Sequence, residues 1–384
     1  MSEAVRDLIS FLAQYDGVQD KAHLASVVAA TFRLTKGRSV LYCREYAVRF
    51  SSSATRSFGN TVLSLSNLQK YDDRPVIVCL VTPAENLCLL ANSTLLKKIS
   101  HSSQDLRENN IRGSFNGSDI AREFEGIANA PANFDRLFAI HAGIGFEGNL
   151  LRLVEATNKI SPSGERYALS LEAVRIVIEA PHRAKAFIES DDCRILKEEL
   201  DAQVRRFRNE ILVAALIPNV NVRGRVIEYL IAGTDEALRQ QLVEALGSES
   251  PLPPFKTENS LGDYSRRFDA FDTETDIKTK VLVLGSNPKA YNLDKMLEFL
   301  SIDRSVLMFY FVGVDPGKLV DTVMVSMFQE MLLRSTVVLR HWSGRNSRGV
   351  TQFEGKSINE LILRPESAID SAASVDFLKM VIDL

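Results

Sequence analysis

The stretch GDYSRRFDAFDTETDIKTKVLVLGSNPKAY, residues 262–291, decides the fold of this chain. Within it, charged residues alternate with uncharged ones from Asp276 to Lys280, and the wholly apolar run VLVL follows. Residues two apart in a strand point to the same face, so Asp276 and Lys278 are expected to project together where the strand enters a core. Charges in such a place are unfavourable unless they are paired or used.

A second carboxylate, Asp263, lies 13 residues before Asp276, a spacing that suits a hairpin bringing the two acids together. Two converging carboxylates repel each other, and Mg²⁺, which prefers hard oxygen ligands, relieves that repulsion. A lysine beside them can orient water or stabilise developing phosphate charge. Asp269 and Asp272 compete with Asp263 as the first acid. Asp272 leaves little room for a turn and two paired strands, whereas Asp269 stays open.

The sequence before this stretch predicts helices and short strands. Hydrophobic periodicity and turn residues indicate the following elements: two helices within 1–35, strands between 39 and 96 that include NTVLSLSNL (60–68), helical character around 119–128 and 133–158, and a long helix from about 170 to 215.

The C-terminal half alternates helices with strands. The predicted order is helices at 223–231 and 234–246, strands at 263–272 and 275–284, a helix at 292–301, a strand at 306–314, a helix at 316–333 and a strand at 336–342. This order is typical of an α/β fold with a mixed sheet, in a chain that is α+β overall.

An Asp followed by Asp-x-Lys on a hairpin resembles the PD-(D/E)XK nuclease superfamily, and in particular type II restriction endonucleases. The leading helix of that family has a basic, glycine-containing start and often an acid, which NVRGRVIEYL (221–230) matches through Glu228. The order of elements from about 220 to 342 is also similar. The chain departs from the motif at Gly262, where the family has proline, and in using Asp as the second acid.

The resemblance implies a restriction-endonuclease-like core, a central mixed sheet flanked by helices. It makes Asp263 and Asp276 metal ligands, Lys278 the catalytic lysine and Glu228 an accessory acid. The implied reaction is Mg²⁺-dependent hydrolysis of double-stranded DNA at specific sequences, leaving 5′-phosphate ends. Cutting both strands of a palindromic site suggests a homodimer.

Two domains are expected from the punctuation of the chain. Residues 1–165 form an α+β domain with a possible role in DNA recognition, and residues 166–384 form the nuclease domain with a leading helical layer.

Three polar segments supply candidate DNA contacts. Arginine bonds guanine in a bidentate manner, and Asn or Gln does the same with adenine. The loop after the strand at 336–342 is the first choice for base contacts, because it combines a tryptophan with two arginines. The candidates are Lys289, Tyr291, His341, Trp342, Arg345, Asn346, Arg348, Gln352, Lys97, Lys98, Arg107 and Arg112.

Composition excludes other classes of protein. With 46 Lys+Arg against 49 Asp+Glu the chain is not a strongly basic nucleic-acid coat protein. Phosphate-loop and dinucleotide motifs are absent from the sequence, which predicts no nucleotide cofactor. The first residues, MSEAVRDLISFLAQYDG, do not resemble a secretory signal, and no apolar stretch of about 20 residues is apparent. A cytoplasmic protein without a membrane partner is therefore expected.

Two alternative functions stay open. The first is a repair, recombination or modification-dependent defence nuclease of the same superfamily. The second is a non-catalytic DNA-binding or scaffold protein, in which Asp276 and Lys278 form a solvated ion pair and Glu228 pairs with Arg225 on a helix surface.

Overall fold

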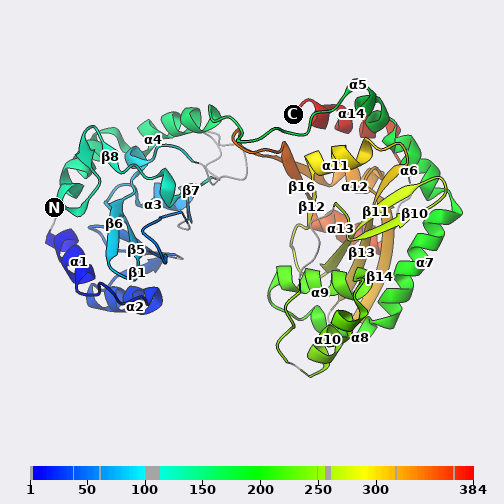
Figure 1. Ribbon diagram of the computed structural model, residues 1–384, viewed down its shortest axis with the longest axis horizontal. Helices are drawn as coiled ribbons and strands as arrows, with labels where there is room; N and C mark the ends of the chain where they lie inside the picture. Colours follow the sequence, from blue (N-terminus) through cyan, green and yellow to red (C-terminus); the bar gives the residue numbers. More distant parts are fainter. Residues whose placement is uncertain are drawn as a thin grey trace. The chain divides into compact units, whose positions relative to one another are not determined.

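The computed structural model describes residues 3–37, 39–59, 62–99, 113–248, 250–255, 261–315, 318–365 and 368–384. It divides into two compact units, drawn in Figure 1. The first comprises Met1–Gly164 together with Arg340–Asn346, and the second comprises Glu165–Leu339 together with Ser347–Leu384. The division at Gly164 is close to the expected boundary, but the return of a late segment to the first unit was not expected.

The first unit is built around a five-stranded sheet with the order β1-β2-β3-β5-β6, in which β3 and β5 are parallel. The unit has two hydrophobic cores. One includes Leu8, Val28 and Ile77, and the other includes Val78, Phe115 and Leu153. Its elements are α1 (Glu3–Ala13), α2 (Lys21–Thr31), β1 (Thr35–Gly37), β2 (Val40–Tyr42), β3 (Ala47–Ser52), β4 (Val62–Ser64), α3 (Leu65–Tyr71), β5 (Val76–Val81), β6 (Asn86–Leu90), η1 (Ser93–Leu95), β7 (Ser114–Asn116), η2 (Gly117–Asp119), β8 (Glu123–Phe124), β9 (Ile127–Ala128), η3 (Pro131–Asn133) and α4 (Phe134–Asn158).

Two predictions for this unit are wrong. The predicted strand at 60–68 ends at Ser64, whose hydroxyl caps helix α3 by accepting a hydrogen bond from the Asn67 N–H at 3.2 Å. The predicted helical character around 119–128 is instead the short hairpin β8–β9. Its turn contains Glu125 and Gly126, both with positive φ, which a helix does not accommodate.

The expectation that the chain has no apolar stretch of about 20 residues is not met by helix α4. With η3 it forms the segment Pro131–Asn158, which by length and composition alone could cross a membrane. In this structure it packs in the first unit through Leu137 and Leu153, and its buried residues include His141 and Asn149. Gly145 has a φ of 73° and interrupts the helix.

The second unit contains a four-stranded sheet with the order β10-β11-β13-β14 and a three-stranded sheet with the order β12-β16-β15. Its elements are α5 (Leu171–Ile178), α6 (Ala180–Ile188), α7 (Asp191–Arg206), α8 (Arg208–Ala214), α9 (Val220–Ala232), α10 (Glu236–Gly247), β10 (Tyr264–Arg267), β11 (Asp272–Val281), β12 (Lys289–Asn292), α11 (Leu293–Leu300), β13 (Ser305–Asp315), β14 (Lys318–Ser326), α12 (Glu330–Arg334), β15 (Thr336–Arg340), β16 (Gly349–Phe353), α13 (Gly355–Leu363) and α14 (Ser371–Ile382).

Strand β11 lies inside the four-stranded sheet. It pairs antiparallel with β10 and parallel with β13, so the expected mixed sheet is present. Ile277 and Tyr310 face a core formed with α7, α8 and α9, whereas Phe309 and Phe311 face a core formed with α6, α11 and α13. The two faces are therefore both covered by helices, as seen around the sheet in Figure 1. The α+β class predicted for the whole chain is confirmed.

Two predicted helices of this unit are also wrong. The long helix at 170–215 is four helices, because Pro181 begins α6, Ser190 caps α7 and Phe207 leaves the helical conformation before α8. The predicted helix at 316–333 is instead strand β14, which pairs with β13, and only its end, from Glu330 onward, is helical in α12. Its run of β-branched residues suits a pleated sheet, and Val323 and Val325 alternate into the core.

Candidate active site

The turn from β10 to β11 brings Asp263 against the middle of β11. The Asp263 N–H donates to the Thr275 carbonyl at 2.9 Å, and its Oδ2 accepts a hydrogen bond from the Ile277 N–H at 2.8 Å. Strand β10 starts one residue later, so Asp263 continues the pairing of β10 with this edge of β11. The carboxylate is thereby fixed beside Asp276.

Asp276 and Lys278 form a buried ion pair on one face of β11. Lys278 Nζ lies 2.5 Å from Asp276 Oδ1, and Asp276 is only 4% exposed. Burial raises the pKa of Asp276 well above its usual value, and the nearby Asp263 carboxylate raises it further, whereas the Lys278 charge opposes both. Burial lowers the pKa of Lys278, but the charges of Asp276 and Asp263 outweigh it and the net shift is upward. Lys278 is therefore a cation at neutral pH.

Glu228 approaches this pair from helix α9. The helix is capped by Asn219, whose side chain accepts the N–H groups of Asn221 and Val222, and Val226 and Leu230 bury its inner side. Burial raises the pKa of Glu228 to about 7, and the Asp263 carboxylate adds to the shift, while Lys278 opposes it. Glu228 is therefore within electrostatic reach of Asp263 and Lys278, which in turn interact with Asp276.

Glu274 is a further acid at this site that was missed from the sequence. Its Oε1 accepts a hydrogen bond from the Ser265 hydroxyl at 2.6 Å, and its Oε2 is buried beside the backbone of Gly262. Burial raises its pKa, and the Asp263 carboxylate contributes in the same direction. Glu274 lies two residues before Asp276, so the same strand periodicity could have identified it.

The competing first acids lie at the other end of the hairpin. Asp269 is exposed in the turn between β10 and β11, and Asp272 starts β11, 3.7 Å from Arg304. In the register of β10 and β11, Asp272 lies opposite Arg267 and is four residues along β11 from Asp276. Of the three candidates, Asp263 is the one beside Asp276.

The donor set at this site fits a magnesium ion. Asp263 and Asp276 are hard oxygen donors, and burial raises the pKa of Asp276 with a further contribution from the Asp263 carboxylate. Among the residues that the structure describes, no group of three or more His, Cys, Asp or Glu side chains is arranged to hold a metal. Mg²⁺ commonly uses one or two carboxylates and completes its shell with water and substrate phosphate oxygens, so two carboxylates suffice.

Several predicted DNA contacts lie in the interior of the protein. Tyr291 is 4% exposed, with its ring 5.9 Å from that of Phe309, and Trp342 is 7% exposed. Arg348 Nη1 donates to Asp294 Oδ1 at 2.6 Å and to the Tyr167 carbonyl at 2.9 Å. These three side chains have structural partners that favour packing over base contact.

The remaining candidates are distributed over both units. Asn346 Oδ1 accepts the Gly164 N–H at 3.0 Å, and Gln352 Nε2 donates to the Asn287 carbonyl at 3.0 Å. The loop itself is divided, because His341, Arg345 and Asn346 belong to the first unit and Arg348 and Gln352 to the second. Exposed side chains are Lys97, Lys289 and Arg345, while Lys98 and His341 are half-buried. Arg107 and Arg112 lie outside the described residues.

The first unit holds a buried polar network with the residue types of a hydrolase site. His141 Nδ1 lies 2.9 Å from Thr94 Oγ1, and its Nε2 lies 3.5 Å from Asp72 Oδ2, which in turn accepts the Ser93 hydroxyl. All four residues are at most 2% exposed. The network ties α4 to the residues around η1.

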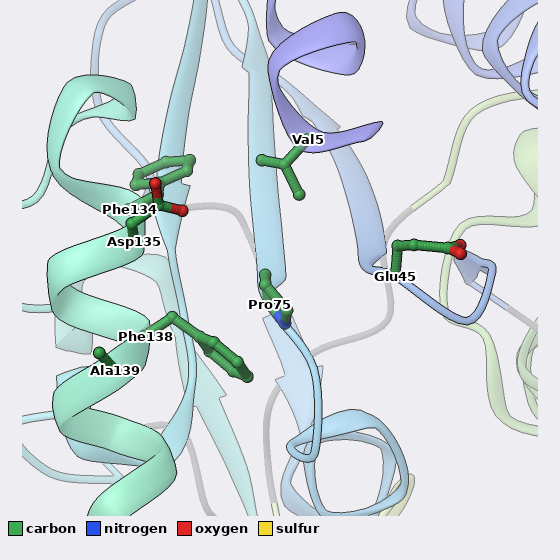
Figure 2. A pocket seen from close by; sticks show the side chains of 7 residues that line it. All are labelled: Val5, Glu45, Pro75, Phe134, Asp135, Phe138 and Ala139. Carbon is green, nitrogen blue, oxygen red and sulfur yellow. The ribbon is translucent and has the colours of Figure 1, made fainter. Parts of the chain in front are cut away.

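A pocket of about 280 Å³ lies beside α4 in the same unit (Figure 2). Val5 comes from α1, Phe134 and Phe138 come from α4, and Pro75 precedes β5. The Glu45 carboxylate points away from the other labelled side chains in this view. The lining is mainly apolar and offers no paired acid and base, in contrast to the β10–β11 site.

Comparison with known proteins leaves the family open, because no family model and no curated protein matches the chain.

Proposed function

We propose that the protein is a Mg²⁺-dependent endonuclease that cleaves double-stranded DNA at specific sequences, in the manner of a type II restriction enzyme. The observation that carries the proposal is the position of Asp263 beside the buried Asp276–Lys278 pair on the β10–β11 hairpin. The scaffold alternative requires a solvated surface pair, and the 4% exposure of Asp276 argues against it.

Each side chain has a defined task in this reaction. Asp263 and Asp276 would hold Mg²⁺, which polarises the scissile phosphate and activates water when bound. The Lys278 ammonium would stabilise the negative charge that develops on the phosphate oxygens, and its raised pKa keeps it charged. Water adds to phosphorus and the bond to the 3′ oxygen breaks, which leaves a 5′-phosphate and a 3′-hydroxyl.

Plasmid cleavage tests the proposal. Unmethylated plasmid incubated with the protein and Mg²⁺ or Mn²⁺ should give discrete bands that disappear with EDTA. Asp276→Ala and Lys278→Ala should each reduce cleavage at least about 1,000-fold while DNA affinity changes little, because both residues act on the reacting phosphate. Asp376→Ala and Lys379→Ala, an exposed acid and lysine on α14, serve as matched controls and should retain full activity.

The outcomes separate the three candidate functions. Full activity in Asp276→Ala and Lys278→Ala rejects this site. Cleavage of modified or branched DNA but not of plain plasmid favours the repair or defence nuclease. DNA binding without any cleavage favours the scaffold protein. A homodimer, expected for cutting both strands, is checked by sedimentation in the presence and absence of DNA.

A further inference from the structure

The turn between β10 and β11 is a rigid, exposed feature of the proposed nuclease site. The Phe268 N–H donates to the Phe271 carbonyl at 2.7 Å and closes the turn. Both phenylalanine rings pack on Phe187 of α6, with centroid distances of 6.0 and 5.2 Å. Asp269 and Ala270 are left exposed at the apex.

Charged side chains surround a surface pocket of about 420 Å³ at this turn, which Arg267, Phe268, Asp269, Asp272 and Arg304 line. Arg304 already donates to the Phe268 carbonyl and lies 3.7 Å from Asp272. The neighbouring Arg266 pairs with Glu199 at 3.1 Å. The side chains of Arg267 and Asp269 form no hydrogen bond or ion pair with any residue that the structure describes, and both are exposed.

The pocket lies within reach of the groove of a bound duplex. Arg267 points to the same face of the hairpin as Ser265, the partner of Glu274, and Asp276 shares that face at two-residue spacing. Arg267 lies four residues after Asp263, which corresponds to roughly 13 Å along β10. The major groove of B-DNA is about 12 Å wide. A duplex with its scissile phosphate at Asp263 and Asp276 therefore presents base edges near the turn.

The chemistry of the pocket suits a base pair better than a phosphate. A phosphate would be repelled by Asp269 and Asp272, which line the pocket beside the arginines. A G·C pair instead offers acceptors and a donor side by side in the major groove. Guanine O6 and N7 accept from arginine, and cytosine N4 donates to a carboxylate.

We propose that Arg267 and Asp269 read one G·C base pair in the major groove, Arg267 bonding guanine and Asp269 bonding cytosine. This inference rests on the proposed nuclease function and names the base-reading element that belongs to it. The closed turn fixes the backbone from which the two side chains project, and neither side chain has to break an ion pair before it contacts DNA.

Selection from a random duplex library, with Ca²⁺ in place of Mg²⁺, tests the inference. The wild-type protein should enrich a G·C pair at a fixed position. Arg267→Ala and Asp269→Ala should each reduce the preference for that pair about 5- to 100-fold. Arg267→Lys should lose the preference but keep the affinity for other sequences, because lysine retains the charge without the bidentate geometry. Arg175→Ala, which removes an exposed arginine on α5, should change nothing.

Two results would overturn the inference while the nuclease proposal stands. In the first, Arg267→Ala weakens binding to every sequence equally, and the salt dependence of binding falls by the amount expected for the loss of about one phosphate contact. In the second, plasmid is cut at discrete sites but the variants keep every base preference of the wild type. Absence of both DNA binding and cleavage in the wild-type protein would remove both proposals together.

Discussion

At the scale of single residues, the Asp276–Lys278 pair, to which we assign a role in cleavage, also affects the stability of the fold. Asp276 is buried and lies beside a second carboxylate, so Lys278 supplies the charge that makes its ionised form tolerable. Removing one partner of a buried ion pair is far more damaging than removing an exposed pair, because it leaves an uncompensated charge.

Lys278→Met should therefore destabilise the metal-free protein by about 2–4 kcal/mol. Urea unfolding in EDTA measures the effect. Arg334→Met, which removes the exposed pair with Glu330, should change stability by less than about 1 kcal/mol. Equal effects of the two substitutions would contradict the burial argument.

Glu228 should make stability depend on pH. Its pKa is about 7 in the folded state against 4.5 in the unfolded chain, so ionisation disfavours the folded state. Stability is highest when the group is protonated and falls as pH rises from about 4.5 through 7. Glu228→Gln should remove this loss and gain about 1–2 kcal/mol over the wild type between pH 5 and pH 8.

Unfolding measured across this pH range checks the sign. Glu298→Gln, an exposed acid on α11, should run parallel to the wild type. A wild-type protein that becomes more stable, relative to Glu228→Gln, as pH rises would show that Glu228 has a lowered pKa instead.

The proximity of Asp276 and Lys278 could be predicted from the sequence, whereas the burial of several candidate DNA contacts could not. Period-two spacing placed Asp276 and Lys278 on one face, and that periodicity is a property of any strand. Tyr291 and Trp342 were chosen for their chemistry, but composition does not reveal burial, and both are packed in the interior. Which residues read DNA stays a prediction.

At the scale of elements, the β10–β11 hairpin depends on Gly262, the residue that precedes Asp263. A Cβ on Gly262 would lie 2.8 Å from both the Thr275 nitrogen and Glu274 Oε2. Residue 262 therefore lies so close to strand β11 that a side chain does not fit there.

Gly262→Ala should destabilise the protein by about 1–3 kcal/mol and reduce plasmid cleavage at least tenfold, because it displaces Asp263. Gly247→Ala is the matched control, since nothing lies within 4 Å of a Cβ there. Thermal unfolding and cleavage rates of both variants test the prediction, and unchanged cleavage in Gly262→Ala would show that Asp263 tolerates displacement.

Elements were predicted correctly where one periodicity dominated. Strand β13 is a continuous apolar run, and α9 carries a helical stripe. Strand β14 was missed because an apolar run of its length is compatible with helix or strand, and only pairing with β13 selects the strand. The helix α3 was missed because its capping residue, Ser64, lies inside an apolar run.

At the scale of the whole molecule, the two units have separate cores. Phe115 is fully buried in the first and Phe309 in the second. No periodicity or composition marks residues 340–346 as part of the first unit, so this feature could not be predicted. Ser343 Oγ donates to the Thr157 carbonyl at 3.0 Å, which is one of the contacts that anchor the segment.

Differential scanning calorimetry should resolve two unfolding transitions. Phe115→Ala should lower one midpoint and Phe309→Ala the other, each by roughly 10 °C, because a deleted core ring affects the unit that contained it. A single transition that both substitutions shift equally would mean that the units unfold together.

The late return of residues 340–346 has a consequence for biosynthesis. Domains near the N-terminus usually fold while the ribosome is still extending the chain. Here the first unit lacks its last segment until about 180 further residues have been translated, a delay of roughly 10–35 s at ~5–20 residues per second. Until nearly the entire polypeptide has emerged, the nascent first unit therefore lacks the hydrogen bonds that Ser343 and Asn346 make with the Thr157 carbonyl and the Gly164 amide in the folded protein.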